Sequence, residues 1–289
     1  MTDNTKQEFH LPVESMGETA VEILAGASKH SKQKIKQAMQ KGCVWLEKSG
    51  KPDESSELTN QKQYTQRLRR AKKILQIGEI LHFYYDEKVL STEPAEATLI
   101  SDKGDYSIWN KPSGMLSQGS KWGDHCTINR WAEKHLKPER PAFIVHRLDR
   151  SASGLIIIAH KKQAASAFAT LFKERKIEKH YQVSVEGDFS TLLEDAKALK
   201  TIDSEIDNKP AISHCQFIAY DKSTNESILD VKIETGRKHQ IRKHLSEVGF
   251  PVVGDRLYGS GENKVDLKLK AVLLGFICPV SGESRLFEL

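Results

Sequence analysis

The alternation of apolar and polar residues along the chain predicts strands interspersed with single helices. Residues 155–159 form a continuous apolar run rich in β-branched side chains, which is typical of a buried strand. Apolar and polar residues alternate at 181–185 and 229–233, which predicts two half-buried strands. Helical spacing at 162–174 predicts a helix that packs on this sheet. Because these elements show no regular strand–helix–strand repeat, we predict an α+β fold with a mixed, largely antiparallel sheet.

The same patterns predict further elements in the second half of the chain. Residues 128–136 and 241–248 have apolar positions on one helical face, so each predicts a short helix. Two apolar runs, 271–278 and 283–287, flank a Ser-Gly turn and predict a closing hairpin.

A smaller α/β module is predicted in the first part of the chain. Ser31 is placed to cap a helix over residues 32–39, and Gly42 is placed to end it. Residues 43–46 then predict a short strand, and a turn at Gly78 opens another.

Stretches without apolar periodicity divide the chain. Residues 1–15 are polar and acidic, and we predict that they are disordered. Residues 48–64 have the composition of a polar insert, and residues 91–96, which include a proline, have that of a linker. We therefore predict an N-terminal module over residues 16–90 and a larger domain over residues 97–289.

Composition narrows the class of protein. The chain has 289 residues, of which 38% are hydrophobic and 29% charged, as in a soluble protein of one or two domains. Its apolar runs are far shorter than the ~20 residues of a membrane span, and its polar N-terminus lacks a signal-peptide core. The four cysteines are widely spaced, and no motif indicates a metal or a cofactor. We expect a cytoplasmic monomer with no membrane partner.

Positive charge is concentrated in the N-terminal module. Residues 28–90 contain 14 lysines and arginines against 7 acidic residues, although the whole chain has a net charge of only +5. Such a basic module is typical of contact with a phosphate backbone. Its helix, Lys41-Gly42-Cys43-Val44, a second basic segment and Gly78-Glu79 follow in an order that resembles the alpha-L RNA-binding motif. This resemblance implies an RNA partner, and a solvated basic helix pair without a ligand is the alternative.

The loop before the predicted strand at 155–159 carries candidate chemistry. Asp149 lies there between Arg147 and Arg150, and flanking cations favour an ionised carboxylate. An ionised carboxylate is suited to act as a nucleophile or a base, and a loop anchored to a core strand can position it well. The alternative is that Asp149 pairs with one of these arginines only to tie the loop down.

Four motifs, taken together and in order, resemble those of RluA-type pseudouridine synthases. They extend over most of residues 105–289, and together they are far more specific than any one of them. The motifs are Asn110-Lys111-Pro112-Ser113-Gly114-Met115, then His146-Arg147-Leu148-Asp149 with Ser153-Gly154, then Lys179-His180-Tyr181, and finally Thr235-Gly236-Arg237-Lys238-His239-Gln240-Ile241-Arg242-Lys243-His244 before Gly254-Asp255-Arg256-Leu257-Tyr258-Gly259.

The resemblance implies a synthase-type fold and an enzyme that isomerises uridine to pseudouridine within RNA, with no cofactor or metal. Asp149 would be the essential carboxylate, either attacking the sugar or removing a proton from it, and Arg242 would pair with it. Tyr181 would stack on the base and serve in proton transfer. Arg147 would help to fill the space that the target nucleotide leaves. The implied RNA-contacting residues are Arg147, Lys111, Arg237, His239 and Gln240. For Lys111, in the turn before Pro112, a purely structural role is the alternative.

The target and two rival functions stay open at this point. The alpha-L module often accompanies this catalytic type in enzymes of large-subunit ribosomal RNA, which is the expected target, and transfer RNA is the alternative. A catalytically silent RNA-binding or ribosome-assembly protein is one rival. A glycoside hydrolase is another, but such enzymes usually use two carboxylates, and the motifs supply only Asp149, with Asp255 in a separate turn. Ala152 stands where the family usually has threonine, so one loop hydrogen bond is expected to be missing.

Overall fold

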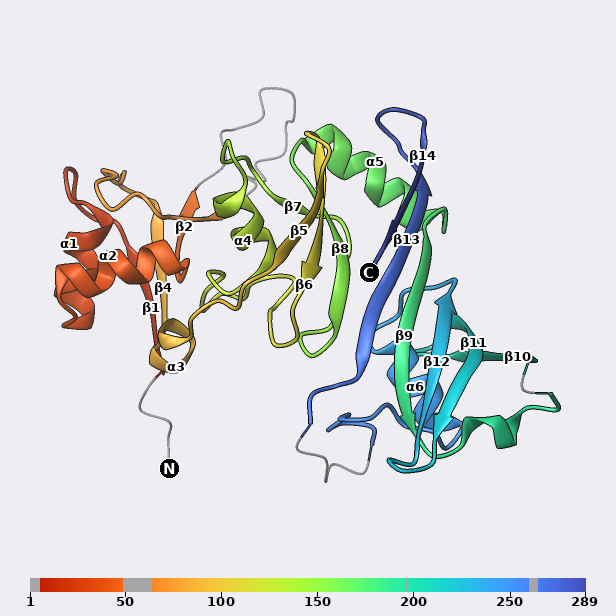
Figure 1. The fold of residues 1–289 in the computed structure, drawn as a ribbon. Helices are drawn as coiled ribbons and strands as arrows, with labels where there is room; N and C mark the ends of the chain where they lie inside the picture. The colour runs from red at the N-terminus through yellow and green to blue at the C-terminus, as the bar shows by residue number, and fades with distance from the viewer. Residues whose placement is uncertain (1–5, 49–63, 196, 260–264) are drawn as a thin grey trace. The chain divides into compact units, whose positions relative to one another are not determined.

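The structure is a computed structural model that describes residues 6–48, 64–195, 197–259 and 265–289. The chain forms two compact units, which Figure 1 shows as a ribbon. The N-terminal unit consists of Met1–Pro94 and Gln118–Thr127, and the C-terminal unit consists of Ala95–Ser117 and Ile128–Leu289. Among the described residues, none of the helices is both long enough and apolar enough to cross a membrane.

The N-terminal unit is a four-stranded antiparallel sheet with two packed helices and a short third one. The strand order is β1-β4-β2-β3. The elements are β1 (Lys6–Pro12), α1 (Ala20–Ser28), α2 (Lys32–Lys41), β2 (Val44–Lys48), β3 (Tyr64–Arg67), β4 (Ile80–Asp86) and α3 (Glu87–Ser91).

Helix α2 shows how local sequence signals set this unit. The Ser31 side chain accepts a hydrogen bond from the backbone N–H of Lys34, and Gly42 ends the helix with φ 86°. Ile35 and Met39 lie on the same face and are fully buried, while the lysines lie elsewhere on the helix. The predicted helix and both of its caps are confirmed.

The start of the chain differs from the prediction of disorder over residues 1–15. Residues 6–12 form β1, which pairs with β4 along its whole length, from Lys6 opposite Asp86 to Pro12 opposite Ile80. Phe9 and Leu11 alternate with polar residues and pack against the core of the unit. The alternation contains only these two apolar residues, and the residues around them are polar and acidic, so the sequence pattern did not predict a strand. Residues 1–5 and most of the predicted polar insert, 49–63, lie outside the described residues.

Residues 118–127 also depart from the predicted division, which placed them in the larger domain. They belong to the N-terminal unit. Asp124 accepts ion pairs from Arg67 at 3.2 Å and from Arg69 at 2.5 Å. The indole N–H of Trp45 donates to the backbone carbonyl of Lys121 at 3.1 Å. The N-terminal unit is thus built from two separate pieces of the chain.

The C-terminal unit contains a ten-stranded mixed sheet with the order β10-β11-β12-β9-β13-β8-β6-β5, while β14 pairs with β13 and β7 with β8. All pairings are antiparallel except that of β13 with β8. This confirms the predicted α+β class. The strands are β5 (Thr98–Asp102), β6 (Tyr106–Lys111), β7 (Phe143–Ile144), β8 (Ser153–Ala159), β9 (Glu178–Glu186), β10 (Leu199–Glu205), β11 (Pro210–Asp221), β12 (Glu226–Ile233), β13 (Leu269–Ile277) and β14 (Ser284–Glu288).

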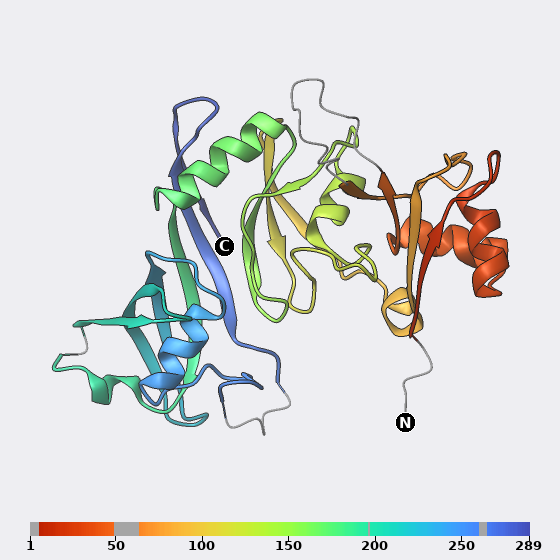
Figure 2. The ribbon, with the colours of Figure 1, turned by 180° about the vertical axis from the view of Figure 1, so that it is seen from behind.

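Helices cover two parts of this sheet, as the view from behind shows (Figure 2). Helix α5 (Lys162–Lys173) packs Phe168 into the cluster that holds Leu155 and Ile157 of β8. Helix α6 (Gln240–Glu247) packs Ile241 and Leu245 against the part of the sheet formed by β9 and β12. The remaining helices are α4 (Ile128–His135) and the short 3-10 helix Phe189–Leu192.

One glycine decides where β8 can begin. Gly154 has φ 108°, and a β-carbon there would lie 2.2 Å from the carbonyl oxygen of Ala271 on β13. No other residue would fit without moving one of the two strands. The contact therefore fixes the start of β8 against β13, five residues after Asp149.

Candidate active site

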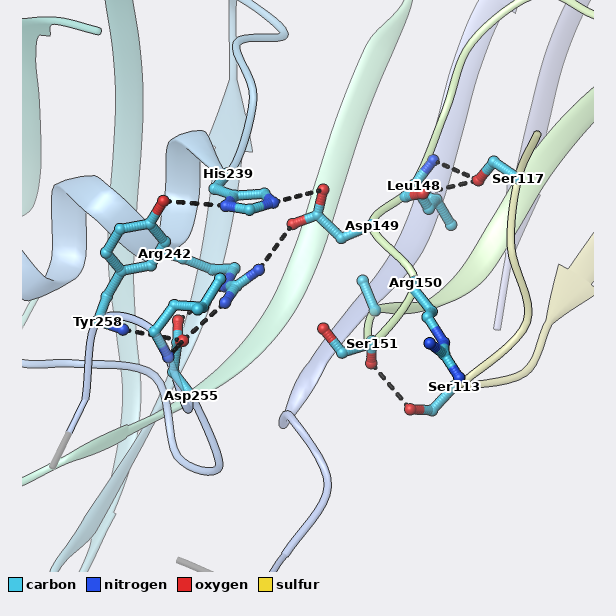
Figure 3. Close-up of polar contacts among 12 residues, drawn as sticks. Ser113, Ser117, Leu148, Asp149, Arg150, Ser151, His239, Arg242, Asp255 and Tyr258 are labelled. Atoms are coloured by element: carbon cyan, nitrogen blue, oxygen red, sulfur yellow. Dashed lines mark hydrogen bonds and ion pairs between the residues drawn. The ribbon is translucent and has the colours of Figure 1, made fainter. Parts of the chain in front are cut away.

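The loop that carries Asp149 lies between β7 and β8 and is held by its backbone. Ser117 Oγ donates to the carbonyl of Leu148 at 2.7 Å and accepts from the N–H of Leu148 at 3.0 Å. Ser113 Oγ donates to the carbonyl of Ser151 at 2.9 Å. Figure 3 shows these contacts, which hold the residues before and after Asp149 in the chain. The neighbours of Asp149 are fixed, and its own side chain stays 26% exposed.

Lys111 gives a third support to this loop. Its side chain is fully buried, and Nζ donates to the carbonyls of Ala152 at 2.6 Å and Met115 at 2.9 Å, with further carbonyls nearby. Burial lowers the pKa of Lys111 to about 8, although the charge of Asp149 acts to raise it. An ammonium sealed among carbonyls has no access to RNA. The structure thus favours the structural alternative for Lys111, a support of the Asp149 loop, over the implied RNA contact.

Arg242 on α6 faces Asp149 from the opposite side. Its Nη1 lies 3.3 Å from Asp149 Oδ2. Its Nε and Nη2 each donate to Asp255 at 2.7 Å, which is a bidentate pair. The Asp255 carboxylate has no exposed surface, and its Oδ1 also accepts the backbone N–H of Leu257. One guanidinium therefore joins an accessible carboxylate to a sealed one (Figure 3).

The charges of this pair stabilise one another. Burial alone would raise the pKa of Asp255, but the hydrogen bonds from Arg242 and the backbone hold it below its ordinary value. Burial would lower the pKa of Arg242, and its two carboxylate partners raise it instead. Both groups are ionised at neutral pH, so Arg242 presents a fixed positive charge to Asp149.

His239 is a third neighbour of Asp149, at the start of α6. It has φ 56°, a left-handed conformation that turns the chain into the helix. Its Nδ1 lies 2.9 Å from the hydroxyl of Tyr258, and its Nε2 lies 3.8 Å from Asp149 Oδ1. Burial lowers the pKa of His239 below its ordinary value, although the charge of Asp149 acts to raise it, so the ring is neutral at neutral pH.

Tyr181 on β9 lies in a pocket of about 90 Å³ together with Asp149 and Arg242; we call it the tyrosine pocket. Arg147 and Arg237 also line it. Burial and the charge of Asp149 raise the pKa of Tyr181, which keeps the phenol neutral. The predicted trio of Asp149, Tyr181 and Arg242 is therefore brought together in space.

Gln240 does not fit its implied role as an RNA contact. It is 3% exposed, and its amide donates to the carbonyl of Ile212 at 2.9 Å while accepting from the hydroxyl of Thr235 at 2.7 Å. Gln240 therefore anchors the start of α6 to β11, and the structure corrects its role to a support of the site. Arg237 is partly exposed in the tyrosine pocket and donates to the carbonyl of Pro210 at 3.0 Å.

Comparison with known proteins assigns this site to a family. The family model described as RNA pseudouridylate synthase matches residues 105–247. An uncharacterized RNA pseudouridine synthase of Aquifex aeolicus is 30% identical over 251 residues, covering 77% of this chain and 79% of that protein. The chain belongs to the RNA pseudouridine synthase family. This confirms the predicted family and reaction class.

Further comparisons agree on the family. The ribosomal large subunit pseudouridine synthase D of Zymomonas mobilis is 31% identical over 208 residues, covering 63% of this chain and 65% of that protein. The tRNA pseudouridine synthase C of Vibrio parahaemolyticus is 29% identical over 224 residues, covering 68% and 90%. The structure of human RNA pseudouridylate synthase domain containing 1 is similar in fold, with TM-score 0.56 and 22% identity over 68% of this chain and 86% of that one.

Ala152 is a departure of this pseudouridine synthase from the usual family residue. Ala152 is 2% exposed and packs in the core, and its carbonyl accepts the hydrogen bond from Lys111 Nζ. The loop is therefore tied at this position through the backbone. A side-chain hydroxyl is not needed to hold it.

Asp255 is predicted to lie in a separate turn, and the structure brings it to the site of the pseudouridine synthase. The signal was present, because Gly254-Asp255 begins the stretch that follows the last motif, but only the tertiary fold shows which cation Asp255 meets. Asp255 does not serve as a second catalytic carboxylate, because Arg242 occupies both of its oxygens and no part of it is exposed. The paired exposed carboxylates of a glycoside hydrolase are thus not formed by these residues.

Two histidines of the motifs, His146 and His244, are structural. His146 Nε2 accepts the backbone N–H of Ile157 at 2.9 Å, and burial lowers the pKa of His146 to about 3. His244 is fully buried with Nδ1 2.9 Å from the hydroxyl of Ser213. Within the described ranges, no group of three or more His, Cys, Asp or Glu residues is placed to hold a metal ion.

Proposed function

We propose that this pseudouridine synthase converts specific uridines in large-subunit ribosomal RNA to pseudouridine, with Asp149 as the essential carboxylate. The observation that carries the proposal is the asymmetry of the two carboxylates on Arg242. Asp149 is accessible, at 26% exposure, and Asp255 is sealed. Arg242 is thereby held in place by one carboxylate and directed at the other.

The reaction detaches uracil from ribose, turns it and rejoins it through carbon five, which is an isomerisation without a net change in atoms. Asp149 serves either as the nucleophile at the anomeric carbon or as the base at the neighbouring ribose carbon. Both routes need an ionised carboxylate, which the adjacent guanidinium favours.

Tyr181 and Arg147 complete the proposed site. The Tyr181 ring borders the same pocket as Asp149 and is suited to stack on the uracil. Its neutral phenol is a hydrogen-bond donor and acceptor for proton transfer at carbon five. Arg147 is exposed at the edge of this pocket, as expected for a residue that fills the space left by a flipped nucleotide.

The proposed target rests on relatives and on charge. The Zymomonas relative is named for the large ribosomal subunit, and the Vibrio relative, named for transfer RNA, supports the alternative target. In the N-terminal unit, Lys32, Lys36, Arg70 and Lys72 are exposed. We propose that they bind RNA phosphates, as the alpha-L resemblance implies.

The deciding experiment maps pseudouridine across total RNA. Cells lacking the gene are compared with cells that carry wild type or Asp149→Asn. We expect one or a few sites to disappear in the deletion and to return only with wild type, and the RNA that holds them identifies the target. Full restoration by the variant would overturn the role of Asp149, and a deletion phenotype without any changed site would favour a silent RNA-binding protein.

The RNA-binding role of the N-terminal unit has its own test. Changing Lys36 and Arg70 to glutamine should lower affinity for the target RNA and flatten its salt dependence, because fewer counterions are released on binding. Lys162 and Lys209 in the C-terminal unit provide a matched control pair. An unchanged salt slope in the N-terminal variant would contradict the proposal.

A further inference from the structure

Two pockets meet at Asp149. The tyrosine pocket of about 90 Å³ lies on one side. A second pocket of about 530 Å³ shares Asp149, His239 and Arg242 with it. We call this second one the arginine pocket; its own lining includes Ser113, Arg150, Ser151, Arg256, Leu257 and Leu267. Its volume lies in the range of pockets that hold small-molecule ligands, and the tyrosine pocket is much smaller.

Two arginines of the arginine pocket are suited to bind a phosphodiester. Arg150, Arg256 and Arg242 line the pocket together with Asp149 and Asp266. Because Arg242 is already paired with Asp255, Arg150 and Arg256 are the guanidinium groups that can bind a phosphate. Arg150 and Arg256 are exposed, and Arg150 is fixed through its Nε, which donates to the carbonyl of Gly114 at 3.2 Å. Guanidinium groups match phosphate oxygens in geometry and charge.

The pocket also presents an apolar side chain on rigid backbone. Leu257 is 66% exposed. Its backbone N–H donates to Asp255 Oδ1 at 2.9 Å, and the N–H of Gly259 donates to the carbonyl of Asp255 at 3.1 Å. The turn that displays Leu257 is therefore held by the same carboxylate that orients Arg242. An exposed leucine on a fixed turn beside two arginines is suited to contact the face of a nucleobase.

We propose that the arginine pocket binds the nucleotide next to the target uridine in the RNA strand. Arg150 and Arg256 hold its phosphodiester, and Leu257 lies against its base. The inference rests on the proposed function, because it places the sugar of the uridine at Asp149 and its base beside Tyr181. The strand that continues from that sugar then enters the pocket on the other side of Asp149.

A chemical double-mutant cycle tests this contact. The substrate is a short RNA with the mapped uridine and one flanking deoxynucleotide, joined by either a phosphodiester or a neutral methylphosphonate. Single-turnover rates are measured at subsaturating enzyme for wild type, Arg256→Gln and a matched surface control, Arg175→Gln. Wild type and the control should slow on the neutral linkage by roughly tenfold, the size of one charge-assisted hydrogen bond.

The decisive quantity is the coupling between the linkage and the arginine. The single-turnover rate of Arg256→Gln should be low on both substrates and nearly the same for the phosphodiester and the methylphosphonate. In a second arm, Leu257→Ser should reduce the rate on a normal neighbour and have little effect when that neighbour is abasic. Additive losses in both arms would overturn the proposal. So would equal rates of wild type on the charged and the neutral linkage, whichever side of the uridine carries it.

These outcomes are separate from those of the proposed function. Asp149→Asn should be inactive on every substrate in the series. If it is inactive while Arg256→Gln and Leu257→Ser behave as wild type, the arginine pocket does not bind the neighbouring nucleotide and the role of Asp149 stands. If Asp149→Asn keeps full activity, the proposed function fails, and the inference that depends on it fails with it.

Discussion

The loop that carries Asp149 and the helix that carries Arg242 meet in one ion pair but are held in different ways. The loop is fixed through its backbone, by Ser113, Ser117 and Lys111, and the Asp149 side chain is left accessible. Arg242 is fixed through its own side chain, by Asp255, and is 5% exposed. The difference teaches that restraint through the backbone leaves the Asp149 side chain free to react. Restraint through an ion pair occupies the side chains that form it, as it does for Asp255.

The largest expected effect comes from removing the charge on the accessible side. Asp149→Asn should lower the single-turnover rate of pseudouridine formation by about 10³-fold or more, as for other residues that act directly in the chemistry. The free energy of unfolding should change by less than about 1 kcal/mol, because Asp149 is partly exposed and Arg242 keeps its bidentate partner Asp255. A strongly destabilised variant would show that the Asp149 side chain itself holds the loop. The contrast between a loop restrained through its backbone and a helix restrained through a side chain would then be wrong.

The opposite pattern is expected on the helix side. Asp255→Asn leaves the buried Arg242 guanidinium without its main partner, so the free energy of unfolding should fall by about 3–5 kcal/mol. Urea denaturation measures this loss. The double variant Asp255→Leu with Arg242→Met should regain much of the stability and stay inactive, because no buried charge is then unpaired. If Asp255→Asn is as stable as wild type, the sealed pair is not what holds the helix side.

Lowering the pH should destabilise the loop that carries Asp149 before it affects the ion pair of Arg242 with Asp255. His146 accepts the N–H of Ile157 only while its Nε2 is unprotonated, and burial lowers the pKa of His146 to about 3. Between pH 6.5 and 3 the unfolded chain binds the proton and the folded chain does not, so stability falls as pH falls. From pH 6.5 to 4.5 this amounts to about 2–3 kcal/mol.

His146→Gln provides the comparison for this pH effect. Glutamine can still accept the Ile157 N–H, and it does not titrate. Urea denaturation from pH 7 to 4.5 should therefore give a shallower loss of stability for the variant than for wild type. Equal slopes would show that His146 is protonated in the folded protein.

The smallest effect is expected where the backbone is restrained by a single hydroxyl. Ser117→Ala removes both hydrogen bonds to Leu148 and should cost about 1–2 kcal/mol of unfolding free energy. It should also slow catalysis by about tenfold, since small misplacements of a reacting group are costly. Ser113→Ala, which loses one bond farther from Asp149, is the matched control and should slow it less. Equal rates for the two variants would show that Ser117 does not align Asp149.

Local patterns in the sequence predict the elements, and the order of motifs predicts the meeting of Asp149, Tyr181 and Arg242. The apolar run at 155–159 lies in β8, and Ser31 and Gly42 cap the two ends of α2 as predicted. Apart from the pair of Asp149 and Arg242, the side-chain partners described above were not predictable from these patterns. The burial of Lys111 depends on how residues 111–115 pass the loop at 149–152, and no local pattern encodes such a contact.

Residues 118–127 have a consequence for how this protein can be divided or recombined. Deleting the chain up to Pro94 would remove Arg67, Arg69 and Trp45, and it would leave Asp124 and Lys121 behind without them. The N-terminal unit is therefore not a cassette that one cut can detach. A graft that exchanges this unit between relatives must transfer both segments, so insertions and sequence changes in the two should be inherited together.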